Sequence, residues 1–220
     1  PPLDAVGVAA HLGYIPQVRA ALAMLTGRKD ALHVALMQFV TLSSGRMGKR
    51  SGNFVTLQDL LDEAGADATR FFYLYRSHDQ HLEFDVDLAR SQSKDNPVYY
   101  VQYAHARICR VFEQLAEKGW AFDQAAGLKA LARLDTDEET ALLALLARYP
   151  ELLRLAAANR TPHTVAFFTK DLAEALHSYY DKHKFLIEEA ELRNARLTLI
   201  SATRVVLVAT LKLLGVSAPE

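Results

Sequence analysis

A short segment between positions 45 and 53, with the sequence GRMGKRSGN, combines three glycines with three basic residues. Glycine lets a backbone close around a ligand, and cationic side chains neutralise the charge that develops on a departing phosphate group. These residue types suit chemistry on a nucleotide phosphate, with Arg46, Lys49 and Arg50 as the candidate cations. A basic, glycine-rich loop is also a common surface feature, and the segment alone leaves that alternative open.

A second group of residues suits contact with nucleic-acid bases. Asn96, Tyr100, Tyr103 and Arg107 recur at spacings of four, three and four, which places them on one face of a helix that begins near Pro97. Aromatic rings and a guanidinium on one stripe can stack on unpaired bases, and each stack contributes about 1–3 kcal/mol. The alternative is that these tyrosines are half-buried between helices with their hydroxyl groups at the surface.

A third group of aromatic and basic residues lies near the end of a later predicted helix, over residues 161–184. Its members are Tyr180, His183, Lys184 and Phe185. The lysine suits a phosphate and the rings suit bases, whereas the phenylalanine can equally plug the end of a helical bundle. Arg193 and Arg196 can reach phosphates, but ion pairs with nearby surface glutamates at positions 188, 189 and 191 are favoured.

Apolar periodicity predicts the elements that position these groups. The first part is mixed, with a helix over 14–25, a buried strand over 33–42, helices over 56–65 and 67–76, and a polar turn over 78–87. The remainder is helical, with helices over 98–118, 137–149, 161–184 and 191–214. The last helix is apolar on nearly all sides, so we expect it at the centre of a bundle.

The composition limits the classes of function. The chain has 220 residues with 25 basic and 26 acidic side chains, which argues against a broad basic surface that coats nucleic acid; if RNA binds, it binds at a local face. The one cysteine, Cys109, rules out a disulfide framework and fits a reducing cytosol. The loop around His78 and His81 has the wrong spacing for a metal site. We expect a soluble, cytoplasmic protein that binds neither membrane nor DNA.

Long blocks of the chain resemble bacterial arginyl-tRNA synthetases, which are class I aminoacyl-tRNA synthetases. Residues 46–50 are similar to the Lys-Met-Ser-Lys-Ser signature of that class, and SGNFVTL at 51–57 resembles the arginyl form. Further similar blocks are DATRFF at 67–72, HLEFDVDLA at 81–89, NPVYYVQYAHARI at 96–108, ELRNARL at 191–197 and LLGVSAPE at 213–220. The resemblance covers residues 13 to 220 in collinear order. It also implies that the connection after the helix over 161–184 approaches the anticodon loop, which makes Tyr180, His183, Lys184 and Phe185 candidates for tRNA contact.

The resemblance implies a mainly α fold in two parts. Residues 1–92 would form the C-terminal end of a Rossmann-like class I catalytic domain, and residues 93–220 a helical anticodon-binding domain. The intact enzyme would activate L-arginine with ATP and Mg²⁺ and transfer it to the 3′ end of arginine tRNA. Lys49, with Arg46 and Arg50, would stabilise the pyrophosphate leaving group. The rest of the ATP-binding loop would be Met47, Gly48, Ser51, Gly52 and Asn53.

Three departures from the family pattern limit this expectation. Ahead of Gly13 the family usually has an Asp-His-His-like stretch, whereas this chain has Ala10-His11-Leu12, so an expected carboxylate near the substrate pocket is missing. Arg46 and Gly48 stand where the signature has lysine and serine. The other class I signature, His-Ile-Gly-His, is absent, and His11-Leu12-Gly13-Tyr14 lies too close to the loop to replace it, because most of a nucleotide-binding sheet must separate the two. We therefore expect an enzyme fragment that is inactive alone. The alternative is a noncatalytic tRNA-binding module of the same fold.

Overall fold

The computed structural model describes residues 3–8, 13–30, 32–43 and 55–220, which fall into two compact units. Unit 1 consists of Pro1–Asp59 and Arg76–Val86, and unit 2 of Leu60–Tyr75 and Asp87–Glu220. The domain boundary near residue 92 stays a prediction.

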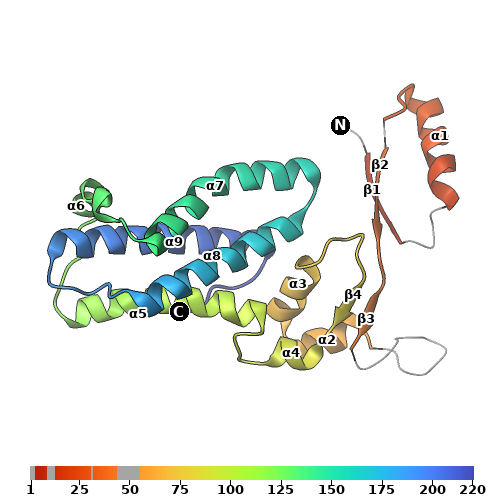
Figure 1. Ribbon diagram of the computed structural model, residues 1–220. Coiled ribbons are helices and arrows are strands. Elements are labelled where there is room, and N and C mark those ends of the chain that lie inside the picture. The colour runs from red at the N-terminus through yellow and green to blue at the C-terminus, as the bar shows by residue number, and fades with distance from the viewer. Residues whose placement is uncertain (1–2, 9–12, 31, 44–54) are drawn as a thin grey trace. The chain divides into compact units, whose positions relative to one another are not determined.

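Unit 1 contains two pairs of parallel strands. Its elements are β1 (Leu3–Val8), α1 (Ile15–Thr26), β2 (Leu32–Met37), β3 (Val40–Leu42) and β4 (Leu82–Phe84). β1 pairs with β2, and α1 forms the crossover between them and packs beside β2 (Figure 1). β3 pairs with β4 across a longer connection. Parallel neighbours require such crossovers, because a tight hairpin joins only antiparallel strands.

Two sequence predictions in unit 1 were wrong. The strand expected over 33–42 is divided at Gln38, whose backbone N–H donates to the carbonyl of His78 (2.9 Å) instead of continuing the first pair. The segment 78–87, expected as a polar turn, contains β4. In β4, Leu82 and Phe84 are buried and Glu83 is exposed, an alternation that suits a half-buried strand.

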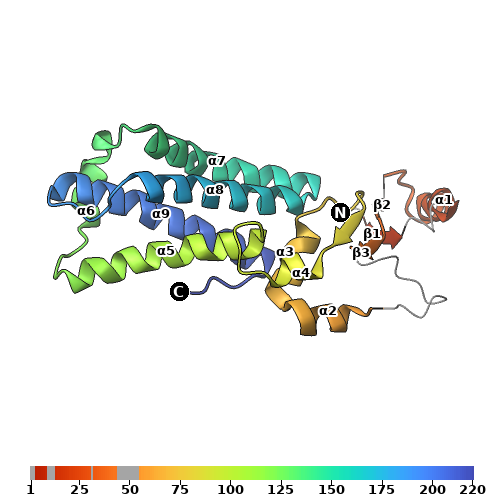
Figure 2. The same ribbon diagram turned by 60° about the horizontal axis from the view of Figure 1, so that its bottom comes forward.

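Unit 2 is helical. α2 (Leu57–Ala64) enters it from unit 1, and the further helices are α3 (Ala66–Leu74), α4 (Val86–Arg90), α5 (Pro97–Glu117), α6 (Gln124–Lys129), the 3₁₀ turn η2 (Leu131–Arg133), α7 (Asp137–Asn159), α8 (Pro162–Lys182) and α9 (Ala190–Leu214). The four long helices α5, α7, α8 and α9 run alongside one another as a bundle (Figure 2). This confirms the predicted mainly helical fold.

Local residue chemistry explains the helix ends. α5 begins at Pro97, where the missing N–H is not needed, and the Asn96 side chain accepts a hydrogen bond from the N–H of Val98. α7 begins with a capping box between Thr136 and Glu139. α7 continues through the exposed Pro150, so the helix end predicted before that proline was wrong.

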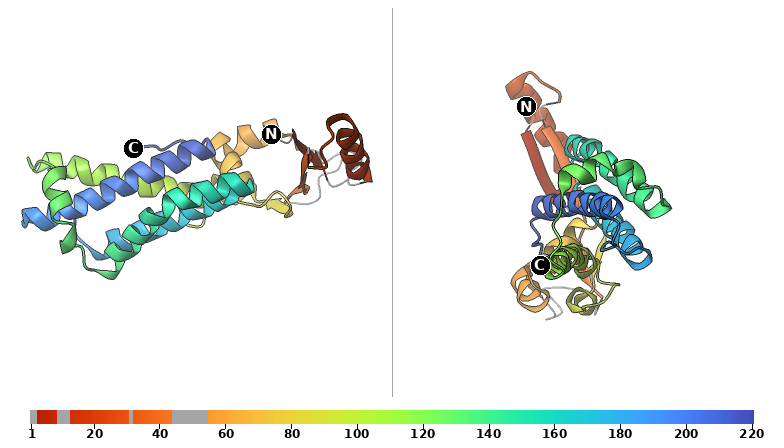
Figure 3. Two further views of the ribbon diagram at one scale, coloured as in Figure 1. Left: turned by 90° about the horizontal axis from the view of Figure 1, so that it is seen from above. Right: turned by 90° about the vertical axis from the view of Figure 1, so that its left-hand side faces the viewer.

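α9 is the central helix of the bundle, as predicted. It packs against α5, α6, α7 and α8 (Figure 3), and its buried threonines at 198, 203 and 210 donate to carbonyl groups of their own helix at 2.8–3.0 Å. Its length and composition would also suit a membrane span, but half of its most apolar window is buried inside the bundle. The helix ends at Gly215, whose φ of 67° is readily adopted only by glycine.

Candidate functional site

Aromatic and charged side chains gather where α5 packs against the C-terminal half of α8. We call this group the Arg107 cluster; its members are Tyr103, Arg107, His177, Tyr180 and Asp181. The guanidinium carbon of Arg107 lies 4.8 Å from the ring centroid of Tyr103 and 4.5 Å from that of Tyr180. The tyrosines therefore hold the cation by cation–π contacts from two helices.

The side chains of the Arg107 cluster differ in their exposure to solvent. Tyr103 is 44% exposed, whereas the side chain of Arg107 is 21% exposed and forms a 3.0 Å ion pair with the exposed Asp181. Tyr99 extends the aromatic surface along α5, since its ring stacks nearly parallel to that of Tyr103 at 6.1 Å. The result is one accessible ring next to a cation that is held in place.

Two pockets flank Tyr180. The first, of about 360 Å³, is lined by Tyr103, Ala106, Arg107, Cys109, Arg110, Glu113, Tyr180 and Glu220. The second, of about 320 Å³, is lined by Val111, Gln114, Lys118, Tyr180, His183, Lys184, Phe185 and Leu186. Each pocket combines an aromatic wall with basic side chains, a combination that suits planar ligands carrying negative charge.

The connection between α8 and α9 forms one wall of the second pocket. Lys184 is exposed there, whereas Phe185 is 5% exposed and packs edge-on against Tyr179, with ring centroids 4.9 Å apart. Packing at the bundle end thus accounts for the position of Phe185, and a stacking role for it stays a prediction. His183 lies 3.0 Å from a carboxylate oxygen of Glu138.

A buried carboxylate anchors this connection from inside. Glu139 is fully buried, accepts hydrogen bonds from the Tyr179 hydroxyl (2.7 Å) and the N–H of Thr136 (3.1 Å), and pairs with Arg196 Nε (3.0 Å). Burial alone would raise the pKa of Glu139, but the Tyr179 and Thr136 hydrogen bonds and the Arg196 cation outweigh it and lower that pKa. The same burial and the adjacent carboxylate raise the pKa of Tyr179. Glu139 and Arg196 therefore form an ion pair at neutral pH.

The two arginines of α9 were expected to pair with surface glutamates, and this was wrong for both. Besides pairing with the buried Glu139, Arg196 donates through Nη1 to the carbonyl of Lys184 (2.8 Å). Arg193 donates to the carbonyl of Ile187 (2.7 Å), and its guanidinium carbon lies 4.2 Å from the Trp120 ring. Both side chains thus donate hydrogen bonds to backbone carbonyls of the connection that contains Lys184.

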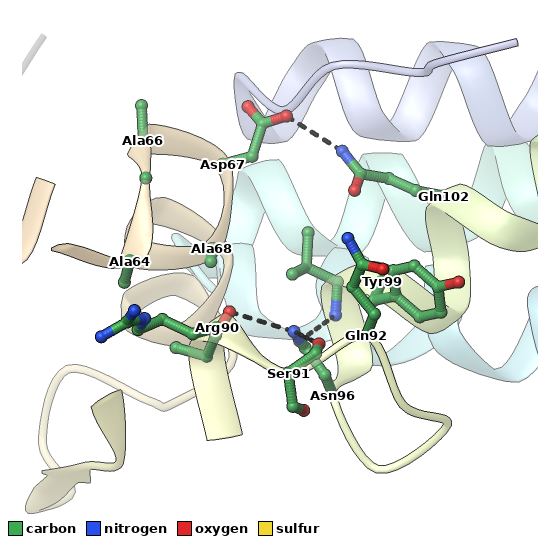
Figure 4. Close-up of a pocket in the computed structure, with 13 residues that line it drawn as sticks. Ala64, Ala66, Asp67, Ala68, Arg90, Ser91, Gln92, Asn96, Tyr99 and Gln102 are labelled. Carbon is green, nitrogen blue, oxygen red and sulfur yellow. Dashed lines mark hydrogen bonds between the residues drawn. The ribbon is translucent and has the colours of Figure 1, made fainter. Parts of the chain in front are cut away.

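Asn96 does not belong to the exposed stripe on which the spacing placed it. It is buried, and its side-chain amide donates to the carbonyls of Ala89 (3.0 Å) and Ser91 (2.7 Å) (Figure 4). Tyr100 is half-buried with its ring centroid 4.3 Å from that of His177, and burial raises the pKa of its hydroxyl. Tyr99, His177 and Asp181 were not among the predicted site residues.

A third pocket lies at the N-terminal end of α5. Figure 4 shows Asp67 facing Gln102 across its rim, with a 2.9 Å hydrogen bond from the amide nitrogen. Asp67 also accepts hydrogen bonds from the backbone and hydroxyl of Ser217. The polar groups that line this pocket thus tie α3, α5 and the segment after α9 together.

The predicted phosphate loop lies outside the described residues. This applies to Arg46, Met47, Gly48, Lys49, Arg50, Ser51, Gly52 and Asn53. Their roles stay predictions. Within residues 3–8, 13–30, 32–43 and 55–220, no three His, Cys, Asp or Glu side chains gather in a group that could hold a metal ion.

Comparison with known proteins places the helical part in a family context. The DALR anticodon binding domain family matches residues 101–220. Among curated proteins, the arginine–tRNA ligase of Hydrogenovibrio crunogenus is 51% identical over 214 residues, and that of Halorhodospira halophila is 53% identical over 216. Both matches cover 96% of this chain but only 36% and 37% of the relatives. The chain therefore spans little more than a third of their length.

Solved structures share the fold. The arginyl-tRNA synthetase of Thermus thermophilus superposes with a TM-score of 0.81 at 26% identity, over all of this chain and 41% of its own. A chain from Campylobacter jejuni superposes with a TM-score of 0.85 at 31% identity, over 99% of this chain and 47% of its own.

Proposed function

This chain belongs to the DALR anticodon binding domain family, and from that premise we propose that its helical part binds the anticodon loop of arginine tRNA. The observation that carries the proposal is the Arg107 cluster, in which a cation is held between Tyr103 and Tyr180 with a pocket on either side. Relatives named arginine–tRNA ligase supply the identity of the tRNA.

The described contacts support different roles for the predicted tRNA-binding residues. Tyr103, Arg107, Tyr180 and Lys184 would touch the RNA, because Tyr103 and Lys184 are exposed and Arg107 and Tyr180 line the first pocket beside Tyr103. Rings and the guanidinium would stack on splayed bases, and Lys184 would pair with a phosphate. Tyr100, His183 and Phe185 would support this surface from behind.

We propose further that residues 1–92 belong to the catalytic domain of an intact arginine–tRNA ligase in the cytoplasm. The parallel β1–β2 pair supports this, because parallel sheets normally have more strands and helices on both faces, whereas β2 keeps His33 and Met37 exposed. ATP with Mg²⁺ would activate the carboxyl group of L-arginine, with release of pyrophosphate, before the arginyl group is transferred to the 3′ end of the tRNA. Lys49, Arg46 and Arg50 would neutralise the departing pyrophosphate.

A noncatalytic tRNA-binding module is the second candidate, because the DALR anticodon binding domain family matches residues 101–220. An assay of pyrophosphate exchange with arginine and tRNA separates the two when the chain is joined to the remaining two thirds of a relative. Restored exchange that falls by about 100-fold in Lys49→Ala supports the ligase. Exchange that is restored but unaffected by Lys49→Ala removes the role given to the loop, and no exchange supports the module.

The anticodon proposal is tested by titrating the chain with arginine tRNA and with the same tRNA carrying a changed anticodon. Tyr103→Ala should weaken binding to arginine tRNA by about 1–3 kcal/mol and reduce discrimination, because one stacking ring is lost. Lys184→Ala should weaken both complexes and lower the salt dependence by about one phosphate contact. Lys129→Ala, an exposed lysine on α6, is the matched control and should bind as the parent does. A parent chain that binds both RNAs equally overturns the proposal.

A further inference from the structure

His177 is the buried member of the Arg107 cluster, and one of its ring nitrogens faces a hydrogen-bond donor while the other faces an acceptor. Nδ1 is 3.1 Å from Arg107 Nη1, and Nε2 is 3.1 Å from the carbonyl oxygen of Tyr100. An arginine nitrogen only donates and a carbonyl oxygen only accepts. Nδ1 must therefore accept and Nε2 must carry the hydrogen, which defines one neutral tautomer of the ring.

Asp181 accepts a second hydrogen bond from the same arginine nitrogen. Its Oδ1 lies 3.0 Å from Arg107 Nη1, the atom that also faces His177. Nη1 has two hydrogens, so one acceptor is available for each. With both hydrogens directed, the guanidinium cannot turn about its own axis, and its plane stays between the rings of Tyr103 and Tyr180.

We propose that His177 and Asp181 are positioning residues that hold the Arg107 guanidinium for stacking on an RNA base, and that His177 must be neutral to do so. The inference rests on the proposed function of the same face. It adds two residues of α8, the buried His177 and the exposed Asp181, to the determinants of RNA affinity. It also makes that affinity depend on pH, with tight binding restricted to the neutral ring.

Protonation of His177 would remove this hold. A hydrogen on Nδ1 would face the hydrogens of Arg107 Nη1, and two cations would lie about 3 Å apart. The ionisable groups around the ring are Tyr100, Tyr103 and Arg107 on α5 and Asp181 on α8, and of these only the exposed Asp181 favours the imidazolium. Burial lowers the pKa of His177 below its usual 6.5. The neutral ring therefore dominates above pH 6.5, and the hold is lost as the pH falls through the lowered pKa.

The geometry is tested first without RNA. Nitrogen-15 NMR of the histidine rings of the free 220-residue chain, with His177→Gln used for assignment, reports which ring nitrogen carries the hydrogen. At pH 7.5 the resonance of Nδ1 should be that of an unprotonated nitrogen and that of Nε2 a protonated one. The opposite tautomer, or a doubly protonated ring at pH 7.5, overturns the inference whatever the RNA measurements give.

The second test follows the dissociation constant for an arginine tRNA transcript from pH 7.5 to 5.5. The parent should weaken by about tenfold, the scale of one hydrogen bond to a charged group. His177→Gln keeps an acceptor and a donor but does not titrate, so it should lose this dependence. His163→Gln, on the same helix and outside the cluster, should behave as the parent does. A His177→Gln variant with the parent's pH profile overturns the inference.

Asp181 provides a test in which two explanations predict opposite signs. If its carboxylate only repelled phosphates, Asp181→Ala would tighten RNA binding. As a positioning residue it should instead weaken binding when replaced by alanine, and Asp181→Asn, which keeps an accepting oxygen, should recover most of the affinity. A parent that discriminates anticodons combined with a tighter Asp181→Ala overturns this inference alone. A parent that does not discriminate anticodons overturns the proposed function.

Discussion

Glu139 is the buried group whose removal should be felt most widely in the helical bundle. Its carboxylate accepts a hydrogen bond from the Tyr179 hydroxyl of α8, pairs with Arg196 of α9 and accepts from the backbone N–H of Thr136 in the capping box of α7. Glu139→Ala removes all of these contacts at once. It leaves Arg196, whose side chain is only 12% exposed, without its anionic partner inside the bundle.

The magnitude follows from that burial. Breaking one partner of a buried ion pair destabilises a protein by about 3–5 kcal/mol, because the remaining charge stays desolvated. Glu139 is fully buried, so solvent screening does not reduce this figure. At roughly 2–4 °C per kcal/mol for a domain of this size, the melting temperature should fall by about 6–20 °C. Tyr179→Phe removes one hydrogen bond and should cost about 1–2 kcal/mol.

The assay is urea unfolding followed by the helical circular dichroism signal, with Glu138→Ala as the neighbouring control. Glu138 pairs with Lys182 and His183 at the surface end of α8, and Lys182 is 61% exposed, so its loss should have a much smaller effect. If Glu139→Ala unfolds within about 1 kcal/mol of the parent, the pair is not a buried anchor and the reasoning from desolvation fails. Arg196→Ala should destabilise the protein to an extent similar to Glu139→Ala, because it leaves the buried Glu139 without its cationic partner.

Two further substitutions probe close packing and capping. In Gly127→Ala the added Cβ would lie 2.8 Å from the Asn194 carbonyl carbon and would also meet the Thr198 hydroxyl, so α6 must move away from α9. The free energy of unfolding, measured with urea, should fall by about 1–3 kcal/mol. An unchanged urea midpoint would show that α6 is not packed tightly against α9. Asn96→Ala removes the cap of α5 and two buried hydrogen bonds and should destabilise by about 1–3 kcal/mol. Asn96→Asp keeps the accepting oxygen for Val98 but turns a second carboxylate oxygen toward the carbonyls of Ala89 and Ser91, so it should not restore the stability of the parent. A melting temperature of Asn96→Ala equal to that of the parent would contradict the capping role.

The long helices were predictable because their signals are local. Apolar periodicity, Asn96 before Pro97, and Gly215 after the last apolar turn all lie within a few residues of the ends they specify. β4 was missed because a three-residue strand is stabilised by pairing with β3, about forty positions earlier, and no local pattern reports that partner. The helix end predicted before Pro150 was wrong because an exposed proline removes one hydrogen bond, which does not end a helix that is packed in the bundle.

The site was predictable only as far as one helix determines it. Tyr103 and Arg107 are one turn apart, so spacing alone placed them together. Tyr99 was missed because the stripe was drawn from Asn96 through Tyr100, and one residue turns the helix by about 100°. His177, Asp181 and the true partner of Arg196 depend on which face of α8 packs against α5 and α9, and one sequence does not specify that pairing.

The end of α8 is held from two sides, so the surface that we propose for base recognition is fixed in position. On one side, Arg107 of α5 donates hydrogen bonds to His177 and Asp181. On the other, the Tyr179 hydroxyl donates to Glu139 of α7, which also pairs with Arg196 of α9. Tyr180 lies between Tyr179 and Asp181 in the sequence and forms the shared wall of both pockets. Because its neighbours on both sides are fixed before any ligand arrives, little conformational entropy would be lost if RNA bound there.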